Sequence, residues 1–303
     1  MTDFSPSLTL HNGDTPHITS TPITLTERIV SKTIHVRRSL FRAVGINRHY
    51  APSPLLSHLL TALSTTFPDG ERFFVDTVRN VRDRISDPVL QADIAAFIGQ
   101  ESMHAQSHAS FNDAVLTPSY NLDKFQHAMI TEFVRLRTLT PRRQLAATVA
   151  LEHFTAMIAG YMLKYPFMIN RLDDNMKNLW LWHAIEEIEH KAVAFDVFKQ
   201  VFDNLPQRRR SMRTISVGFL LSNATMTAHL MWQDRQHSLG SIKNLAKNAR
   251  DLGLILHLMI TILPEYLAFY RADFHPKQID HTPLLRKWLP QLERISSNNY
   301  VFS

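Results

Sequence analysis

Two Glu-x-x-His units are the residues of this sequence whose types and spacing are best suited to chemistry. The first pairs Glu101 with His104, and the second pairs Glu187 with His190. Residues three or four apart share one face of an α-helix, so each unit places a carboxylate beside an imidazole, which is a metal-ligand arrangement. His183 lies one turn before Glu187 on the same face and is expected to be a third imidazole ligand. The alternative for His183 is a core position or a supporting hydrogen bond to a ligand.

Two further acidic residues, Glu71 and Glu152, stand among apolar neighbours in helical stretches. A buried, unpaired carboxylate costs several kcal/mol. Together with Glu101 and Glu187 they would carry four negative charges, which two divalent cations would neutralise. The charge sum therefore predicts a dinuclear centre, in which Glu101 bridges or chelates. The alternative for each glutamate is a water-facing position at a helix edge.

Glu186 competes with Glu187 for the ligand role, because it also lies one turn from His190. We prefer Glu187, because it aligns with His183 and repeats the spacing of the first Glu-x-x-His unit. Glu186 is then expected to support a ligand.

Two more histidines lie close to the predicted ligands. His108 follows His104 by one turn and is expected to be a ligand, a hydrogen-bonding support or a core residue. His153 points about 100° away from Glu152, so we expect it to support a ligand or to be structural.

The composition fits a helical protein with an oxygen- and nitrogen-ligated metal. The chain has 303 residues, is 45% hydrophobic and contains only 8 Gly, which favours a large helical core. Cysteine is absent, so disulfides and thiolate metal sites are excluded. A site built from His and Glu favours iron, with manganese or zinc as alternatives.

The excess of basic residues has no accompanying nucleic-acid motif. Lys and Arg number 33 against 27 Asp and Glu, and they are scattered apart from Arg142–Arg143 and Arg208–Arg210. We therefore expect no nucleic-acid partner. Residues 1–22 are rich in Ser, Thr and Pro and lack a signal-peptide pattern, which predicts a flexible tail on a cytoplasmic protein.

These residues must be positioned by helices, because no strand alternation appears and Asp87–Pro88 and Thr140–Pro141 provide helix starts. The expected class is all-α: a ferritin-like four-helix bundle with one long crossover and additional N- and C-terminal helices. Residues 23–303 would form one domain, with the metal-binding bundle at about 67–203 and a helical extension at about 207–295. The expected helices are Thr24–Ser31, Pro54–Thr65, Asp69–Arg84, Pro88–Val115, Leu122–Arg137, Arg142–Leu163, Asp173–Val201, Arg213–Asp234, Ile242–Phe269 and Pro283–Glu293.

Two apolar stretches of about 18 residues, Ile215–Trp232 and Leu252–Phe269, raise the question of a membrane. Polar residues interrupt both, and basic residues flank both ends of the pair, so the charge bias gives no orientation. We expect buried helices that cover the bundle. Peripheral contact with lipid, or a tunnel for a fatty substrate, is the alternative.

Several of these motifs resemble those of a bacterial family described as predicted metal-dependent hydrolases. The resemblance runs from about His35 to Pro276 and is carried by Phe67–Phe74, Gln100–His108, Leu151–Ala156, Trp182–Val197 and Asp273–Pro276. It implies a hydrolytic reaction. The ligand order is also similar to that of ferritin-like di-iron N-oxygenases acting on p-aminobenzoate, which carry the histidine that matches His183. That similarity implies a cofactor rather than a substrate.

The leading hypothesis is therefore a di-iron oxidase or oxygenase that uses O2 and an electron donor on an organic, apolar substrate. The alternative is a hydrolase in which two metals activate water. Iron storage, or a non-catalytic membrane-associated helical protein, is less expected. The sequence leaves homo-oligomer formation open.

Overall fold

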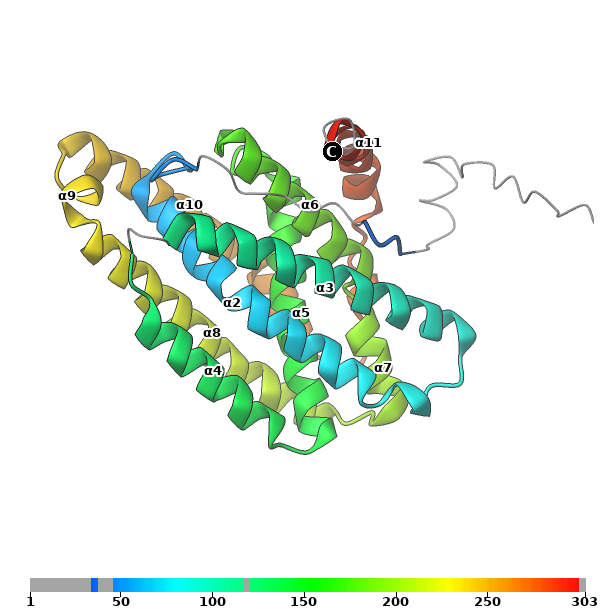
Figure 1. The fold of residues 1–303 in the computed structure, drawn as a ribbon. Coiled ribbons are helices and arrows are strands. Elements are labelled where there is room, and N and C mark those ends of the chain that lie inside the picture. The colour runs from blue at the N-terminus through cyan, green and yellow to red at the C-terminus, as the bar shows by residue number, and fades with distance from the viewer. Residues whose placement is uncertain (1–33, 38–45, 117–119, 300–303) are drawn as a thin grey trace, which may run out of the picture.

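The computed structural model describes residues 34–37, 46–116 and 120–299, and its regular structure within them is entirely helical (Figure 1). The prediction of an all-α bundle is confirmed. The expected tail 1–22 and the expected helix Thr24–Ser31 lie outside the described residues. The helices are α2 Pro54–Arg79, α3 Pro88–Leu116, α4 Asp123–Arg137, α5 Pro141–Lys164, α6 Asp174–His190, α7 Val193–Val201, α8 Leu205–Gln233, α9 Arg235–Ser238, α10 Ile242–Ala268 and α11 Thr282–Asn299, with short 3-10 turns at Arg82–Arg84, Ile169–Arg171 and Pro276–Gln278.

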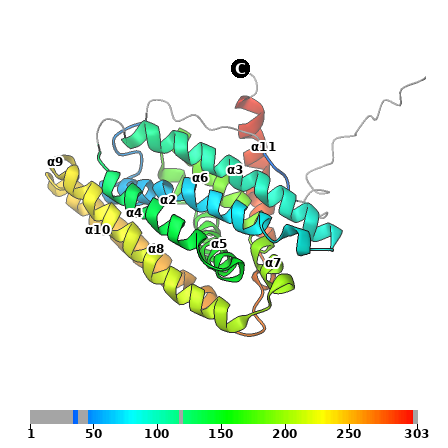
Figure 2. The same ribbon diagram turned by 60° about the horizontal axis from the view of Figure 1, so that its bottom comes forward.

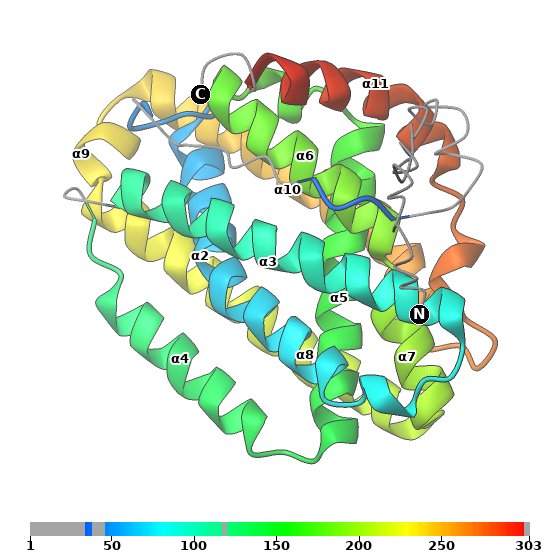
Figure 3. The same cartoon turned by 45° about the vertical axis from the view of Figure 1, so that its right-hand side comes forward.

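Two helix pairs form the middle of the molecule. α2 packs along α3 and α5 packs along α6, while α2 also contacts α5 and α3 also contacts α6. α4 lies in the long connection between α3 and α5 and rests on α2 (Figures 1 and 3). The paired helices surround the segments that carry the Glu and His units.

α2 is one continuous helix, so the predicted break between Pro54–Thr65 and Asp69–Arg84 is wrong. Pro68 has no N–H group and leaves the carbonyl of Ser64, four residues earlier, without its helical donor. The side chain of Asn112 on α3 replaces that donor, with Nδ2 lying 3.1 Å from the Ser64 oxygen. A tertiary hydrogen bond thus keeps the helix intact.

The predicted helix Asp173–Val201 is in fact two helices. α6 ends at His190 and α7 begins at Val193, although neither Gly nor Pro marks the junction. At the junction, Lys191 Nζ donates to the carbonyl oxygen of Ile279 at 2.5 Å. The break coincides with the docking of the distant C-terminal segment, which a local helical pattern cannot reveal.

α8 begins eight residues earlier than predicted. Asn204 Oδ1 accepts a hydrogen bond from the amide of Gln207 at 2.8 Å and caps the helix. Pro206 therefore occupies the first turn of α8, where its missing N–H costs nothing. Arg213, the predicted start, lies in the third turn.

α8, α9 and α10 form an outer layer on α2 and α5 (Figure 2). α5 and α10 are both long and apolar enough to cross a membrane by length and composition alone. The apolar window of α5 is 83% buried, whereas that of α10 is only 11% buried. The expectation that the last apolar stretch is buried is therefore wrong: α10 covers the bundle with one face and exposes the other.

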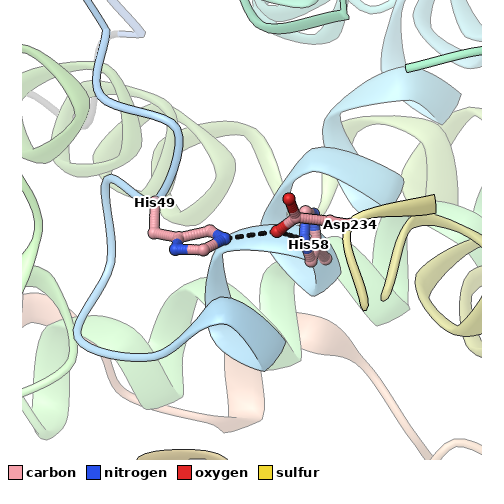
Figure 4. Close-up of side chains that lie close together, drawn as sticks. All are labelled: His49, His58 and Asp234. Atoms are coloured by element: carbon pink, nitrogen blue, oxygen red, sulfur yellow. Dashed lines mark hydrogen bonds and ion pairs between the residues drawn. The ribbon is translucent and has the colours of Figure 1, made fainter. Parts of the chain in front are cut away.

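Asp234 joins this layer to the rest of the molecule (Figure 4). Its carboxylate lies at the end of α8 and accepts hydrogen bonds from His49 Nε2 at 2.5 Å and His58 Nε2 at 3.1 Å. Arg48 donates to the other oxygen at 2.8 Å, and the Ser238 hydroxyl donates at 2.6 Å. One buried carboxylate thus connects the segment before α2, α2 itself, α8 and α9.

The role of the Asn112 amide as the donor that replaces the missing N–H of Pro68 can be tested by substitution. We expect Asn112→Ala to lower the free energy of unfolding by about 2–3 kcal/mol, because it leaves the Ser64 carbonyl without a donor and the Ser64 hydroxyl without its acceptor. In a Pro68→Ala background the restored N–H can donate to Ser64, so the same change should cost about 1 kcal/mol less. Urea unfolding of the four proteins measures this. Equal costs in both backgrounds would contradict the assignment.

His58 gives a test by pH. Burial lowers the pKa of His58 to about 4, although hydrogen bonding to Asp234 opposes this. The unfolded chain, with a histidine pKa of about 6.5, binds more protons between pH 6.5 and 4, so stability falls as the pH drops through that window. We expect the wild type to lose roughly 3 kcal/mol more than His58→Gln between pH 7 and pH 4. If the free energy of unfolding fell by the same amount between pH 7 and pH 4 in both proteins, His58 would not be held neutral in the folded state.

Candidate metal centre

Seven buried side chains converge between α2, α3, α5 and α6. None is more than 4% exposed. Their ligand atoms form three overlapping groups, each within 4.8 Å. The groups are Glu71, His104 and His183; Glu101, His104 and Glu187; and Glu101, Glu152 and His190. The structure therefore brings together all seven residues that the sequence nominated as ligands.

The imidazole nitrogens of the cluster lie within 3.1–3.6 Å of its carboxylate oxygens. His190 Nε2 lies 3.1 Å from Glu101 Oε1 and 3.6 Å from the nearest oxygens of Glu152 and Glu187. His183 Nε2 lies 3.1 Å from Glu187 Oε1. Carboxylate oxygens and imidazole nitrogens from three helices thus face one small volume.

Most of these inward atoms have no hydrogen-bond partner. Both carboxylate oxygens are buried and unsatisfied in Glu71, Glu101 and Glu152. The same is true of Glu187 Oε2, His104 Nδ1 and His190 Nε2. Each such group would cost about 1–3 kcal/mol or more if nothing bound it. Hard carboxylate oxygens and imidazoles suit divalent cations such as iron, manganese or zinc, so the residues present fit a metal centre.

His104 is oriented by Glu186. The Nε2 atom of His104 donates to Glu186 Oε2 at 3.0 Å, and Arg37 donates to the other oxygen of Glu186 at 3.0 Å. With its proton on Nε2, a neutral His104 presents a lone pair at Nδ1. That atom lies 3.6 Å from Glu101 and 3.7 Å from Glu187. Glu186 itself faces away from the seven-residue cluster.

His190 is oriented by Gln100. The Gln100 amide nitrogen donates to Glu189 Oε2 at 3.0 Å and to the His35 carbonyl at 2.9 Å. Its oxygen must therefore accept the proton of His190 Nδ1, which lies 2.8 Å away. This arrangement leaves the Nε2 lone pair of His190 pointing at the carboxylates.

A hydrogen-bond chain orients His183 in the same sense. The Ser64 hydroxyl donates to Asn112 Oδ1 at 2.7 Å and so accepts from His108 Nδ1 at 2.8 Å. His108 Nε2 can then accept from His183 Nδ1, 2.8 Å away. Burial, and next the neighbouring His183, keep the pKa of His108 low, which favours its neutral form. The lone pair of His183 Nε2 therefore faces the cluster. His108 is separated from the cluster by its hydrogen bond to His183.

Arg37 connects two of these supports. Besides Glu186, it donates to both oxygens of Glu189, at 2.7 and 2.8 Å. One guanidinium therefore contacts Glu186, the partner of His104, directly, and reaches Gln100, the partner of His190, through Glu189. Arg37 was not predicted from the sequence, because it lies 149 residues from Glu186 in the chain and no local pattern joins them.

The electrostatics of the cluster favour bound cations. Burial, and next the charge of Glu101, raise the pKa of Glu71 and Glu152 well above the usual range. Burial alone would also raise the pKa of Glu187, but His190 and His183 hold it well below its usual range. The carboxylates thus outnumber the positive charges that their own histidines provide. Divalent cations at the same place would compensate the remaining charge.

A large apolar cavity reaches the cluster at Glu71. Its volume is about 640 Å³, and it lies between α2, α4, α5 and α8. Its lining is dominated by Phe67, Phe74, Phe133, Leu151, Ile215 and Phe219. Arg143 and Arg210 also line it. The cavity is large enough for a drug-sized organic molecule and lies beside one candidate ligand.

His153 does not join the cluster. Its Nε2 lies 3.2 Å from the carbonyl oxygen of Glu265, and its ring packs on Phe269 and Phe274. Burial lowers its pKa to about 4, so it is a neutral core residue between α5 and α10.

His49, His58 and Asp234 form another group close enough to hold a metal (Figure 4). This group differs from the main cluster, because Asp234 is already satisfied. It accepts from both histidines and from Ser238, and the Arg48 guanidinium lies 2.8 Å away and supplies a positive charge. A cation is not needed there, so the seven-residue cluster is the candidate metal centre.

Comparison with known proteins agrees with a metal centre. The chain matches the family of predicted metal-dependent hydrolases over residues 35–280. The match contains all seven clustered residues and begins at the segment that carries Arg37. Neither a curated protein nor a solved structure is matched by the chain. Because the match covers most of the sequence, the chain belongs to the family of predicted metal-dependent hydrolases.

Proposed function

We propose that the protein is an enzyme with a dinuclear metal centre that hydrolyses an apolar organic substrate. The observation that carries the proposal is the convergence of unsatisfied carboxylate oxygens and three outward-anchored histidines in one dry volume. Four carboxylates balance the charge of two divalent cations. Membership of the family supports hydrolysis as the reaction.

The proposed ligands are Glu71, Glu101, His104, Glu152, His183, Glu187 and His190. Two divalent metal ions in such a site supply Lewis acidity and lower the pKa of a bound water to near neutrality. The chain itself holds the geometry. Gln100, Glu186 and His108 each fix one ring, so that little reorganisation is needed when the metals bind.

The cavity indicates the substrate class. Its aromatic and aliphatic lining suits an extended apolar group, and the carboxylate of Glu71 borders it. A substrate that filled the cavity would exclude water around the centre and bring its reacting bond close to Glu71. An ester or amide of an apolar acid fits this description.

Oxidation of the same substrate by O2 is the second candidate. The donor set contains no thiolate, and four carboxylates with the imidazoles of His104 and His190 repeat the ligand set of di-iron carboxylate bundles, to which His183 adds a third imidazole. Redox-active iron and an external electron donor would be required. The proposed ligands and the cavity are the same for both reactions.

Metal analysis of protein purified without oxygen separates these possibilities. Hydrolysis predicts turnover of apolar esters with zinc or manganese under argon. Oxidation predicts O2 consumption by the iron(II)-loaded protein and no turnover under argon. Full esterase activity in metal-free protein would overturn the metal-dependent proposal.

The ligand assignment predicts a graded loss of metal. We expect Glu152→Ala and His190→Ala to lower metal affinity by at least about 100-fold and Gln100→Leu by about 10–100-fold, because the last removes only the anchor of His190. Metal stoichiometry and the metal-induced rise in Tm measure this. Glu132→Ala changes an exposed glutamate at the cavity and should bind metal normally. Wild-type stoichiometry in both ligand variants would refute the assignment.

The cavity can be filled at Gly218. A Cβ atom there meets nothing within 4 Å, so Gly218→Trp is expected to project into the cavity without a clash. We expect kcat/KM for long-chain esters to fall about tenfold or more while metal content is unchanged. Gly253→Trp is the matched control, because Gly253 has equally open space on α10 and does not line the cavity. Equal kinetics in both variants would show that substrate binds elsewhere.

A further inference from the structure

The outward faces of α8 and α10 are apolar along much of their length. On α8, Val217, Leu221 and Trp232 are 59%, 60% and 64% exposed. On α10, exposed apolar side chains recur mostly at intervals of three, four or seven residues: Ile242, Leu245, Leu252, Leu256, Met259, Ile260, Leu263 and Leu267. That spacing places them on one stripe of the helix. Soluble monomers rarely expose stripes of this extent.

The same layer carries charge of one sign. Residues 205–270 contain eight Lys and Arg against three Asp and Glu, a net of +5 out of +6 for the whole chain. Asp234 and Asp251 are buried and Glu265 is half-buried. The exposed charged residues of the layer are therefore all basic. These are Arg210, Arg213, Arg235, Lys243 and Arg250. They lie toward the two ends of the layer, with the uncharged stripes between them.

The layer is attached to the bundle along its inner face. Tyr161 of α5 hydrogen-bonds His257 of α10 at 2.7 Å, and the backbone amide of Leu55 on α2 donates to Asn248 Oδ1 of α10 at 3.0 Å. Asn248 and Asp251 of α10 are buried against the protein. If α10 crossed a bilayer, these contacts with the bundle would be lost. They are kept if α10 lies flat on the bilayer surface.

We propose that the exposed face of α8 and α10 docks on an anionic lipid bilayer. The apolar stripes would enter the boundary between headgroups and acyl chains, and the basic residues would contact lipid phosphates. A second copy of the chain fits this face less well, because self-association would bring only like charges together. Docking does not depend on the metal chemistry.

Docking would also place the cavity beside the membrane. Arg210, Thr214 and Gly218 of α8 line the cavity and are themselves exposed. The helix that lies on the bilayer is therefore also a wall of the candidate substrate pocket. An apolar substrate could pass from the lipid into the cavity with little exposure to water.

Vesicle flotation with the full-length protein tests the proposal. We expect binding to phosphatidylcholine–phosphatidylglycerol vesicles that weakens with salt, and weaker binding to phosphatidylcholine alone. Leu256→Glu/Ile260→Glu should reduce binding about tenfold or more. Trp180, Trp182 and Trp288 are buried, so a blue shift of tryptophan emission on binding should come from Trp232 and disappear in Trp232→Phe.

The control is Val89→Glu/Val134→Glu, which adds the same charge at valines that are 68% and 57% exposed on α3 and α4. It should bind vesicles like the wild type. Equal binding by Leu256→Glu/Ile260→Glu and by this control would overturn the proposal. Light scattering tests whether a second copy of the chain covers this face instead. If the wild type were a dimer that did not bind vesicles, and Leu256→Glu/Ile260→Glu were a monomer, the face would be a self-association surface.

Discussion

The cost of burying several carboxylates in an apolar interior is the constraint on which the rest of this structure depends. Glu71, Glu101, Glu152 and Glu187 are almost fully removed from water, and burial raises the pKa of Glu71 and Glu152 well above the usual range. A helical bundle has no free backbone groups to offer such residues, because its amides are used within the helices. Cations are therefore the natural partners, and the four helices can be understood as the frame that holds the ligands at one point.

The support around the cluster is as specific as the cluster itself. Each inward-facing histidine has its other nitrogen tied to a different partner: Glu186, Gln100 or His108. Arg37, from a segment before the first helix of the bundle, contacts Glu186 directly and is linked to Gln100 through Glu189. The N-terminal segment 34–37 is thus part of the site. Its removal would leave Glu186 and Glu189 without their cation in a buried place, and the orientation of two imidazoles would be lost with it.

The C-terminal layer solves a different problem. α5 must be apolar because it is enclosed on all sides, whereas α10 is equally apolar with one face left open. Two polar residues of α10, Asn248 and Asp251, are buried against the bundle, while the outward face of the helix is largely apolar between its basic residues. Residues of α8 and Glu71 line the same cavity, so the proposed membrane face, the cavity and the candidate metal centre adjoin one another. Hydrolysis and oxidation would both profit from that arrangement.

The sequence by itself determined the helical class and the membership of the cluster, because Glu-x-x-His spacing fixes which side chains share a helix face before any tertiary contact forms. It could not determine the continuity of α2, since the amide that compensates Pro68 comes from Asn112 on another helix. It could not show that α6 ends at His190, or that Arg37 fixes two ligand partners, since both depend on chain segments far away in sequence. It also left open which faces of the last apolar helices meet water. Periodicity reports the residues on a face, but only packing against α2 and α5 decides which face is covered.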